Sequence, residues 1–483
     1  MLSPLSTYWL NQFDRFDNQT KDVFLKRTSH GFMSHLFVVW LNYKDNSAIT
    51  DFKFSTQSLL EASKDYFDLP TTPSAPLDLT SLLKRTSTNP SHRQIKHIFY
   101  IVSESFSDWA FDPVFDAIGL TSGLKSLIDN KHGFKMPYFV ENGPCTIRSL
   151  SVQMTGLVQT KLYLHKLFGQ FNLSPTAPGG IFHQLGYESR FFYGAYDKEG
   201  KDKYGLFDKI ALIEGFDQTF DGIDMLNFAH NKPYQKHLFN EWGTHDNVMF
   251  DFVKDKVSKA TQPTFNMIMT TSIHPPYDLD LKYFNVPDLS TFFDKHFPAS
   301  KRSPGMDANI LEHIWWYDKQ VTHFIKTIAK AYPDSLFVIT SDHYGRVAPV
   351  NTNDPKVHYL VPLILYSPTL APKMLAHIAS HTDITPTLIE LVAPKGFVYH
   401  SFGKPFFSND PKAPFDPNNQ AFGYDIVGNE DFLYTQDFGL RPLKQMDKNQ
   451  KAIAETQAKK MYQKMESLND LSLYMLLKGS VIK

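Results

Sequence analysis

The chain has 483 residues, of which 42% are hydrophobic and 14% are aromatic, so it is too apolar to be disordered along most of its length. Its 49 Lys and Arg residues balance 50 Asp and Glu residues, and the formal net charge of -1 argues against nucleic acid as a partner. The single cysteine, Cys145, excludes an intramolecular disulfide and a cysteine-rich zinc site.

The first part of the chain differs in texture from the rest. Residues 1–92 mix short apolar clusters with polar runs and end in a proline-rich stretch, so we expect an N-terminal appendage and linker. The apolar run at 36–41 is far too short to span a membrane, and no signal-peptide pattern follows Met1. We therefore expect either a cytosolic protein or an export or membrane segment outside this sequence.

From residue 93 to 408, short apolar runs alternate with helical patterns. The expected buried strands lie at 98–102, 190–194, 265–271, 335–340 and 361–366. The expected helices lie at 245–258, 308–331 and 385–392. This alternation predicts an α/β fold with a mostly parallel central sheet that helices cover on both faces.

After the expected catalytic domain, residues 409–483 form a predicted C-terminal subdomain. It begins with short aromatic segments and ends in a polar helix at about 448–476. We expect this helix to be solvated and to lie on the domain, although a partner-binding coiled coil is an alternative.

Polar residues follow several of the predicted strands, at the sheet edge where ligands bind in such folds. Glu104, Asp197, His274 and the adjacent pair Asp342 and His343 stand at these strand ends. Two adjacent residues reach one cation only where the strand breaks, and the glycine two positions after His343 favours a break. A carboxylate with an imidazole suits Mn, Zn or Fe, so the pattern predicts a metal site.

Thr146 is the candidate nucleophile. It follows a turn at Gly143 and Pro144 and precedes apolar residues at helical spacing, so we expect it near a helix N-terminus. Free N–H groups and the helix dipole favour a phosphate or sulfate anion there. A nearby metal would lower the pKa of the Thr146 hydroxyl as it lowers that of water. The alternative is that Thr146 only caps the helix.

Five motifs follow one another along the chain: 103–105 (SES), Gly143-x-x-Thr146, 271–277 (TSIHPPY), 341–345 (SDHYG) and 381–387 (HTDITPT). In this order they resemble the sulfatase-like domain of lipoteichoic acid synthases and bacterial phosphoglycerol transferases, in the alkaline phosphatase superfamily. Three further positions support the resemblance: Trp242-Gly243-x-x-Asp246, Tyr317-Asp318 and 401–404 (SFGK). The resemblance extends from about residue 95 to 408 and implies an alkaline phosphatase-like sandwich.

The resemblance implies a set of site residues. One divalent cation, typically Mn²⁺ with Mg²⁺ or Zn²⁺ as alternatives, would be held by Glu104, Thr146, Asp342 and His343. Thr146 would be the nucleophile, and His274 would bind the substrate or protonate the leaving group. Asp197 and Arg148 are the further substrate-binding candidates.

The resemblance also implies partners and a location. The substrate would be a phospholipid head group such as that of phosphatidylglycerol, or another phosphodiester, and the acceptor of phosphoglycerol would be a glycan or polymer. The protein would act outside the cytoplasm, in the periplasm or at the outer face of the inner membrane. A membrane surface is a possible further partner there. The Trp and Arg that follow the family's equivalent of Asp197 are absent here, which leaves the donor open.

Several alternatives stay open. A phosphatase or phosphodiesterase would pass the phosphoryl group to water, and a non-catalytic binding protein could keep the fold. A sulfatase would need Cys-x-Pro-x-Arg, but Ile147 and Ser149 stand at the Pro and Arg positions, so we expect Cys145 to be a small buried residue. His358 and His381 could supply a second metal site.

Overall fold

The computed structural model describes residues 54–90, 95–158, 162–164, 171–195, 207–230, 238–239 and 242–483. Asp197 lies outside these residues. Residues 56–483 form one compact unit, and the division of the chain at residues 93 and 409 stays a prediction. Within the described part of the chain, no helix combines the length and the apolarity needed to cross a membrane.

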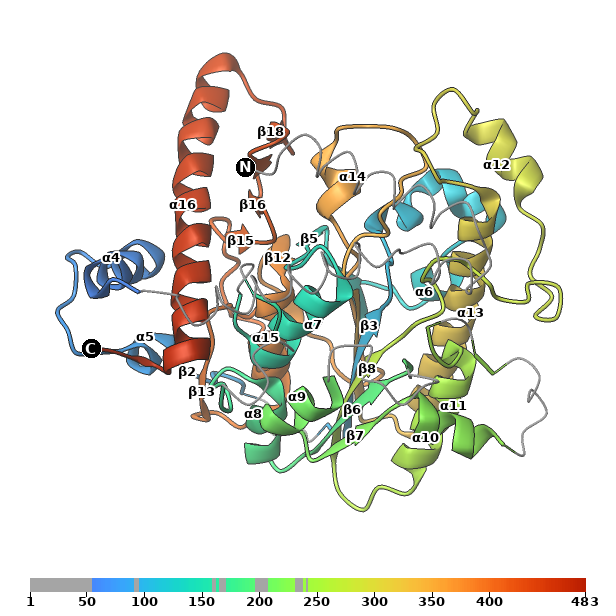
Figure 1. Cartoon of the computed structure of the whole chain (residues 1–483), viewed down its shortest axis with the longest axis horizontal. Helices are drawn as coiled ribbons and strands as arrows, with labels where there is room; N and C mark the ends of the chain where they lie inside the picture. The colour runs from blue at the N-terminus through green and yellow to red at the C-terminus, as the bar shows by residue number, and fades with distance from the viewer. Residues whose placement is uncertain are drawn as a thin grey trace, which may run out of the picture. The chain divides into compact units, whose positions relative to one another are not determined.

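A seven-stranded sheet forms the centre of this unit (Figure 1). In spatial order its strands are β4 (Gly133–Lys135), β10 (Ile364–Tyr366), β9 (Ser335–Ser341), β3 (His97–Ser103), β8 (Thr264–Met269), β6 (Glu188–Tyr193) and β7 (Gln218–Phe220). All adjacent pairs are parallel except those of β10, which runs antiparallel to β9 and β4. The predicted α/β fold with a mostly parallel sheet is therefore confirmed.

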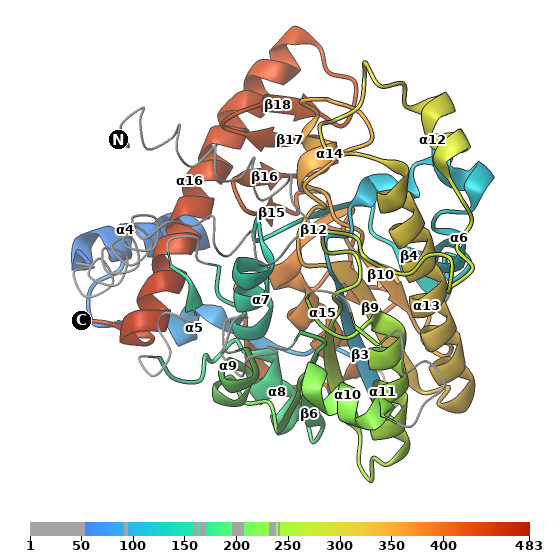
Figure 2. The same cartoon turned by 45° about the vertical axis from the view of Figure 1, so that its right-hand side comes forward.

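Helices cover both faces of the sheet, as Figures 1 and 2 show. On one face lie α10 (Gly222–Ala229), α11 (Asp246–Ser258) and α13 (Ala308–Ala331), and on the other lie α7 (Thr146–Thr155), α8 (Pro178–Gln184), α9 (Phe207–Ile213) and α15 (Ile384–Val392). Side chains of β3 alternate between these faces because successive strand residues point in opposite directions. Phe99 packs against Phe324 of α13, whereas the Tyr100 hydroxyl donates to Gln153 of α7 at 2.6 Å.

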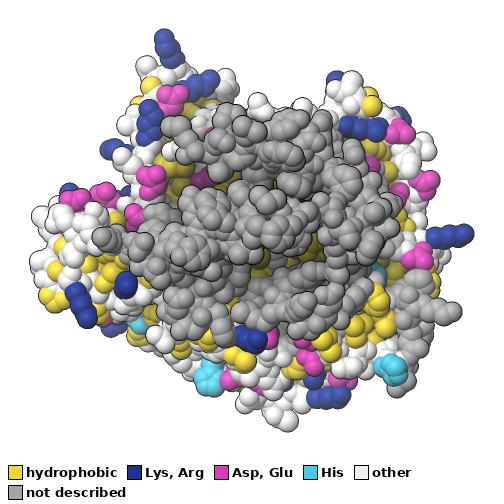
Figure 3. Space-filling view, viewed as in Figure 1, with side chains coloured by type: hydrophobic (Ala, Val, Ile, Leu, Met, Phe, Trp, Pro, Cys, Tyr) yellow, Lys and Arg dark blue, Asp and Glu magenta, His cyan; other side chains and the backbone are white. Residues whose placement is uncertain are grey.

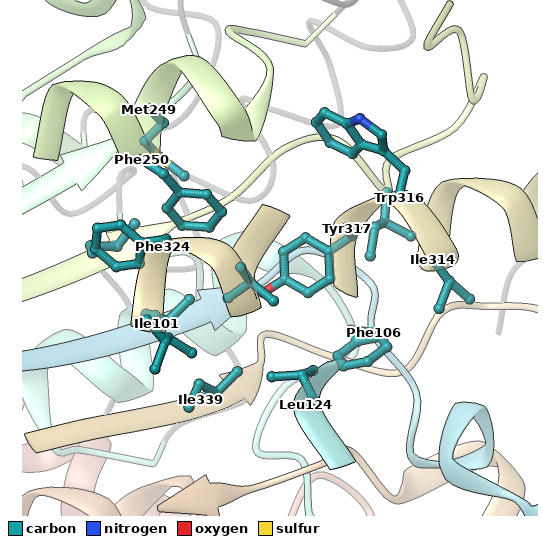
Figure 4. Close-up of a cluster of buried hydrophobic side chains, with 14 of the residues drawn as sticks. Ile101, Phe106, Leu124, Met249, Phe250, Ile314, Trp316, Tyr317, Phe324 and Ile339 are labelled. Carbon is teal, nitrogen blue, oxygen red and sulfur yellow. The ribbon is translucent and has the colours of Figure 1, made fainter. Parts of the chain in front are cut away.

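The core between the sheet and α13 sits directly under the strand ends that carry the site. Figure 4 shows Tyr317 at the middle of a cluster that includes Ile101, Phe106 and Ile339. The Tyr317 hydroxyl makes a short hydrogen bond with Ser103, the last residue of β3. This contact fixes the strand end from which Glu104 leaves.

The C-terminal helix corrects one expectation. α16 (Lys448–Lys478) has an exposed polar first half, but most of its residues from Ser467 to Leu476 are buried, so a solvated helix describes only part of it. α4 (Thr56–Phe67) and the antiparallel sheet of β15 (Ala421–Phe422), β16 (Ile426–Gly428), β17 (Phe432–Thr435) and β18 (Gly439–Pro442) pack against it. The cover comes from distant segments, which the local pattern does not reveal.

Shorter elements complete the unit. The remaining strands are β1 (Leu77–Asp78), β2 (Lys84–Thr86), β5 (Tyr138–Val140), β11 (Lys373–Met374), β12 (Ile378–Ser380), β13 (Val398–His400), β14 (Phe407–Ser408) and β19 (Val481–Ile482). The remaining helices are α5 (Leu79–Leu83), η1 (Asp108–Phe111), η2 (Pro113–Ile118), α6 (Ser122–Lys125), α12 (Ser290–His296), α14 (Pro355–Tyr359) and η4 (His381–Asp383).

On the described part of the face in Figure 3, Lys and Arg side chains are interspersed with Asp and Glu side chains. Neither charge gathers there into a continuous field.

Candidate metal centre and active-site pocket

Three predicted ligands meet at the ends of two neighbouring strands. β3 and β9 are paired in parallel with Ser103 opposite Ser341, so the residues that follow them emerge side by side. Ligand atoms of Glu104, Asp342 and His343 all lie within 4.8 Å of one another, and all three side chains are buried. His343 Nε2 is 3.3 Å from Asp342 Oδ2 and 3.9 Å from Glu104 Oε1. The chain thus brings together a set of two carboxylates and one imidazole.

Two atoms of this set have no hydrogen-bond partner. Asp342 Oδ2 and His343 Nε2 are buried and make no hydrogen bond, which is costly unless another group satisfies them. The other ring nitrogen, His343 Nδ1, lies 2.7 Å from the Tyr344 carbonyl oxygen and therefore carries the proton. The Nε2 lone pair faces the carboxylates, so the residues present fit a divalent cation.

The electrostatics of the cluster support the same conclusion. Burial and the nearby Asp342 raise the pKa of Glu104 well above its ordinary value, because two carboxylates in a dry site repel each other. Burial lowers the pKa of His343, which favours the neutral imidazole that binds metals. A bound cation would relieve the repulsion between the two carboxylates.

The loop after Asp342 is held closely against the end of β3. Ser105, with φ of 50°, donates its backbone N–H to Asp342 Oδ1 at 2.8 Å. Gly345 donates its N–H to Ser107 Oγ at 2.7 Å. A Cβ on Gly345 would lie 2.7 Å from the Ser105 carbonyl oxygen, so only glycine fits without a shift. β9 ends at Ser341, so the expected break after the strand is confirmed, and Gly345 permits the close approach of the loop to β3.

Glu141 is a site-supporting residue that the sequence reasoning missed. It follows β5 and is buried, and its Oε2 accepts the Tyr344 N–H at 2.5 Å. Burial raises the pKa of Glu141 well above its ordinary value. The signal in the sequence was an acid directly after a short apolar run, as for Glu104.

Thr146 is the first residue of α7, as predicted. Its Oγ1 donates to Glu104 Oε2 at 3.2 Å, which places the hydroxyl beside the three-ligand cluster. The preceding turn packs tightly on the helix: a Cβ on Gly143 would lie 2.5 Å from the Ser149 backbone nitrogen. Ser149 in turn donates its hydroxyl to the Asp342 carbonyl oxygen at 2.5 Å. The turn before Thr146 and the loop of the candidate metal ligands are therefore tied together.

A pocket of about 290 Å³ opens next to this cluster. It is lined by Glu104, Cys145, Thr146, Ile147, Tyr193, Trp242, Thr271, His274 and Arg346. Thr146 faces it from the N-terminus of α7, where unpaired N–H groups and the helix dipole favour an anion. The pocket joins the metal-ligand set, the candidate nucleophile and His274 in one space.

His274 is held at the wall of the pocket by two neighbours. Its Nδ1 lies 2.6 Å from the Pro275 carbonyl oxygen, which also accepts the Trp242 indole N–H at 2.6 Å. The Trp242 ring lies against the imidazole with centroids 4.0 Å apart. Burial is the main cause that lowers the pKa of His274 to about 4, so its Nε2 is an unprotonated acceptor at neutral pH.

Asp246 positions the loop that leads to His274. It is fully buried, and its Oδ1 accepts the backbone N–H groups of Thr271 at 2.9 Å and Ser272 at 3.3 Å. Burial raises the pKa of Asp246 to about 7. The role of Asp246, one of the motif positions, is thus to hold backbone geometry rather than to line the pocket.

Arg346 is the cation that the sequence reasoning missed. It directly follows the 341–345 motif, lines the pocket and has φ of 59°, a left-handed conformation that is uncommon outside glycine. Its charge reaches the cluster, since it acts to lower the pKa of Glu104 and of His274. Backbone conformation rather than residue pattern brings it here.

Other predicted residues lie elsewhere or differ in detail. Arg148 is not among the residues that line the pocket, and its guanidinium lies over the Tyr163 ring at 4.9 Å, so its substrate role stays a prediction. Asp197 falls outside the described residues, so its substrate role stays a prediction. Cys145 is half-buried and lines the pocket, which corrects the expectation of a buried residue.

The suggested second metal site finds no support in the histidines proposed for it. His381 Nε2 lies 2.8 Å from the Ser341 carbonyl oxygen, and its Nδ1 accepts the Asn142 N–H at 3.1 Å. His358 Nε2 lies 2.6 Å from the Thr352 carbonyl oxygen. These ring nitrogens serve structural hydrogen bonds instead of a cation.

Comparison with known proteins agrees with this geometry. The family model described as Sulfatase matches residues 96–393, which is more than half of the chain. The chain belongs to the sulfatase family. The matched region includes the strand ends that carry Glu104 and Asp342 and the helix that begins at Thr146.

Two curated proteins illustrate where this sulfatase-family chain stands. It is 24% identical over 249 residues to the lipoteichoic acid synthase-like protein YvgJ of Bacillus subtilis strain 168, covering 47% of this chain and 37% of that protein. It is 23% identical over 331 residues to phosphoglycerol transferase I of Xanthomonas campestris pv. campestris strain B100, covering 65% of this chain and 43% of that protein. The chain spans less than half the length of these relatives.

Solved structures confirm the fold of this sulfatase-family member. A protein of the alkaline phosphatase superfamily from Vibrio parahaemolyticus has a TM-score of 0.57 at 17% identity, covering 86% of this chain and 97% of that chain. The lipoteichoic acid synthase LtaP from Listeria monocytogenes has a TM-score of 0.58 at 16% identity, covering 81% and 96%. The predicted alkaline phosphatase-like sandwich is therefore confirmed.

Proposed function

We propose that this chain is a metal-dependent phosphotransferase that cleaves a phosphodiester through a phospho-threonine intermediate. The observation that carries the proposal is the hydrogen bond from Thr146 Oγ1 to Glu104 Oε2, at the edge of the three-ligand cluster and inside the pocket. A hydroxyl at a helix N-terminus, beside carboxylate and imidazole ligands, is the arrangement that nucleophilic attack on phosphorus needs.

The metal-ligand residues are Glu104, Asp342 and His343, with the Thr146 hydroxyl beside them. When bound, the cation would lower the pKa of a nearby hydroxyl and balance negative charge on the phosphate. A mixed carboxylate and imidazole set suits Mn²⁺, and Mg²⁺ or Zn²⁺ are the alternatives. Manganese is our proposal for the working metal.

In the first half-reaction, Thr146 Oγ1 forms a bond to phosphorus and the bond from phosphorus to the leaving alcohol breaks. The hydroxyl loses its proton, and the departing alkoxide gains one. In the second half-reaction, an acceptor hydroxyl displaces Thr146 from phosphorus by the reverse exchange. One site serves both steps because the threonine stays in place between them.

Two pocket residues would bind the substrate. Arg346 places a positive charge beside the cluster, where it would pair with a phosphate oxygen. His274 carries its proton on Nδ1, so its Nε2 would accept a hydrogen bond from a substrate hydroxyl. Of the two roles expected for His274, its unprotonated state at neutral pH favours substrate binding.

The names of the relatives support a specific donor and acceptor class. One is a phosphoglycerol transferase and another is lipoteichoic acid synthase-like. We therefore propose a phosphatidylglycerol-like head group as the donor, a glycan or polymer as the acceptor, and an extracytoplasmic site of action at a membrane surface. Without an acceptor, water would take its place and the enzyme would act as a phosphodiesterase.

The test is turnover of a chromogenic phosphodiester and of fluorescent phosphatidylglycerol by the wild type and by Thr146→Ala. Each is measured after EDTA treatment and after Mn²⁺ is added back, with Thr86→Ala, an exposed threonine on β2, as the matched control. We expect Mn²⁺-dependent turnover that Thr146→Ala abolishes and Thr86→Ala retains. Adding a glycan acceptor should then shift products from hydrolysis to transfer.

Other outcomes would replace the proposal. Turnover of phosphodiesters that survives Thr146→Ala would exclude the phospho-threonine intermediate. If Mn²⁺ binds but neither phosphodiester reacts, sulfate esters become the next substrates to test. A protein that binds the metal and turns over neither ester class would be a binding protein on this fold.

A further inference from the structure

A second pocket, of about 250 Å³, lies where the N-terminal and C-terminal elements of the unit meet. Its walls come from the end of α4, from β2, from the segment before α15 and from α16. These elements are far apart in the sequence, and α4 packs along α16 (Figure 1). The catalytic pocket shares none of its lining residues with this one.

The second pocket has an excess of positive charge. Four basic residues line it, Lys84, Arg85, Lys404 and Lys464, against the two acids Asp68 and Asp383. The whole chain carries a formal charge of -1, so this excess is local and does not follow from composition. An anion is therefore the ligand that the pocket favours.

The two acids cancel only part of this charge. Asp383 is buried, and its carboxylate accepts the backbone N–H groups of Ser380 and Lys404, each at 2.8 Å. Asp68 is exposed and pairs with the ammonium group of Lys464 at 2.5 Å. Asp68 balances Lys464, and Asp383 lies within the electrostatic reach of Arg85. Four cations against two carboxylates still leave a net positive charge for a ligand.

Arg85 is the best-placed cation. Its Nε donates to the Ser401 carbonyl oxygen at 3.2 Å, which fixes the guanidinium plane. Among the described residues, its Nη1 and Nη2 have no hydrogen-bond partner. A guanidinium held in this way presents two parallel donors to a phosphate.

Aromatic rings form another part of the pocket wall. Tyr66 and Phe67 of α4 both lie against Phe402, with ring centroids 5.4 Å and 6.1 Å apart, and Tyr66 also lies 5.9 Å from Phe422. Gln420 lines the same space, and its side-chain amide has no hydrogen-bond partner among the described residues. Aromatic faces with a free amide suit the apolar face and the hydroxyl groups of a sugar ring.

We propose that this second pocket binds a phosphorylated sugar, with the phosphate on Arg85 and Lys404 and the ring against Tyr66 and Phe402. The site is separate from the catalytic pocket, and the proposal does not depend on the reaction at Thr146. The segment that precedes α15 forms one wall of the second pocket through Ser380 and Thr382. Between them, His381 contacts Ser341 next to the metal ligands.

Calorimetric titration of the full chain tests the proposal. The probes are glucose 6-phosphate, glucose, glycerol 3-phosphate and inorganic phosphate, and the variants are Arg85→Gln and Lys404→Gln. Lys404 is exposed, so its substitution leaves the fold intact even if Arg85→Gln destabilises the protein. The matched control is Arg346→Gln, which removes a cation from the catalytic pocket instead.

We expect glucose 6-phosphate to bind the wild type more tightly than the other three probes. Each of Arg85→Gln and Lys404→Gln should weaken this binding about tenfold, the size of one charge-assisted hydrogen bond, whereas Arg346→Gln should retain it. Turnover of a small chromogenic phosphodiester should be unchanged in Arg85→Gln and Lys404→Gln. Unchanged turnover separates this proposal from the proposed function.

Three results would overturn the proposal. The first is no binding of glucose 6-phosphate to the wild type, or binding that only Arg346→Gln weakens. The second is equal affinity for glycerol 3-phosphate or inorganic phosphate, which would remove the role of the sugar ring. The third is binding that persists unchanged in both Arg85→Gln and Lys404→Gln.

Discussion

Asp342 Oδ2 and His343 Nε2 lie 3.3 Å apart, both buried and both without a hydrogen-bond partner. Two adjacent residues would point to opposite faces of a continuing strand, so this pairing exists only because β9 ends at Ser341. Ser105 donates its backbone N–H to Asp342 Oδ1, and His343 Nδ1 donates to the Tyr344 carbonyl oxygen. Asp342 Oδ2 and His343 Nε2 stay without a hydrogen bond. The pair is prepared for a cation rather than for another protein group.

Metal binding should therefore stabilise the fold. Mn²⁺ at about 100 times its Kd should add about 2.7 kcal/mol to the free energy of unfolding and raise Tm by a few degrees. His343→Ala should abolish this increase, because it removes the imidazole ligand. His230→Ala, at the exposed end of α10, is the control that should keep it. Thermal unfolding with EDTA and with Mn²⁺ measures both, and an unchanged increase in His343→Ala would place the cation elsewhere.

Substitution of Arg346 should separate substrate binding from metal binding. Arg346→Gly removes the charge while favouring the left-handed backbone that Arg346 adopts at φ of 59°, so stability should be unchanged or higher. The kcat/KM for a phosphodiester should fall about 10- to 100-fold, as expected when a charged contact to phosphate is lost. Steady-state kinetics measure this fall, and Arg346→Lys should restore part of it.

Thermal unfolding of the same variant tests whether Arg346 has a purely structural role. Arg346→Gly should retain the Mn²⁺-induced increase in Tm, since the guanidinium is not a ligand. A variant with normal kcat/KM would show that Arg346 does not contact the substrate.

Gly345→Ala should weaken the metal site from outside the ligand set. Its Cβ would lie 2.7 Å from the Ser105 carbonyl oxygen, which would push the 341–345 loop away from β3. Metal affinity should fall about 10- to 100-fold, the usual effect of disturbing residues that support ligands. Gly180→Ala is the control, because its Cβ would come closest to the movable Leu173 side chain, at 3.2 Å, and would only be in ordinary contact with the Glu214 carbonyl oxygen at 3.9 Å. Equal Mn²⁺ affinity in both variants, measured by calorimetry, would refute the role of this close approach.

Glu214 should make stability depend on pH far from the metal site. Burial raises its pKa to about 8 in the folded chain, against an ordinary value near 4.5. Between these values the folded state holds a proton that the unfolded state has lost, so the stability contributed by Glu214 falls as pH rises from about 4.5 to 8. The slope from this one group approaches about 1.4 kcal/mol per pH unit.

Glu214→Gln removes this slope and keeps an oxygen that accepts the Ser174 N–H, now bound at 2.9 Å. Urea unfolding at several pH values should therefore show a shallower pH dependence for the variant than for the wild type. Parallel curves for the two proteins would show that Glu214 is charged in the folded state at neutral pH.

Much of the central fold could be predicted from the sequence, and for a physical reason. The predicted strand at 98–102 lies within β3 because a fully buried strand needs an unbroken apolar run, which is visible locally. Glu104, Asp342 and His343 could be predicted as ligands because polar residues after such runs must emerge at one edge of a parallel sheet. Thr146 could be placed at a helix start because the Gly143 and Pro144 turn precedes a helical pattern.

The rest depended on contacts between distant segments. Arg346 reaches the pocket through a left-handed backbone that no residue pattern marks, and Glu141 matters only because the 341–345 loop folds over it. The polar composition of α16 predicted a solvated helix. The cover over its buried half comes from α4, which is about 400 residues away in the sequence, so the local pattern does not show it. The sequence by itself predicted the long buried strands of the sheet, the candidate ligands at their ends and the place of Thr146 at a helix start. The tertiary structure decided which charged and aromatic residues line the two pockets, since each pocket arises where separate elements meet.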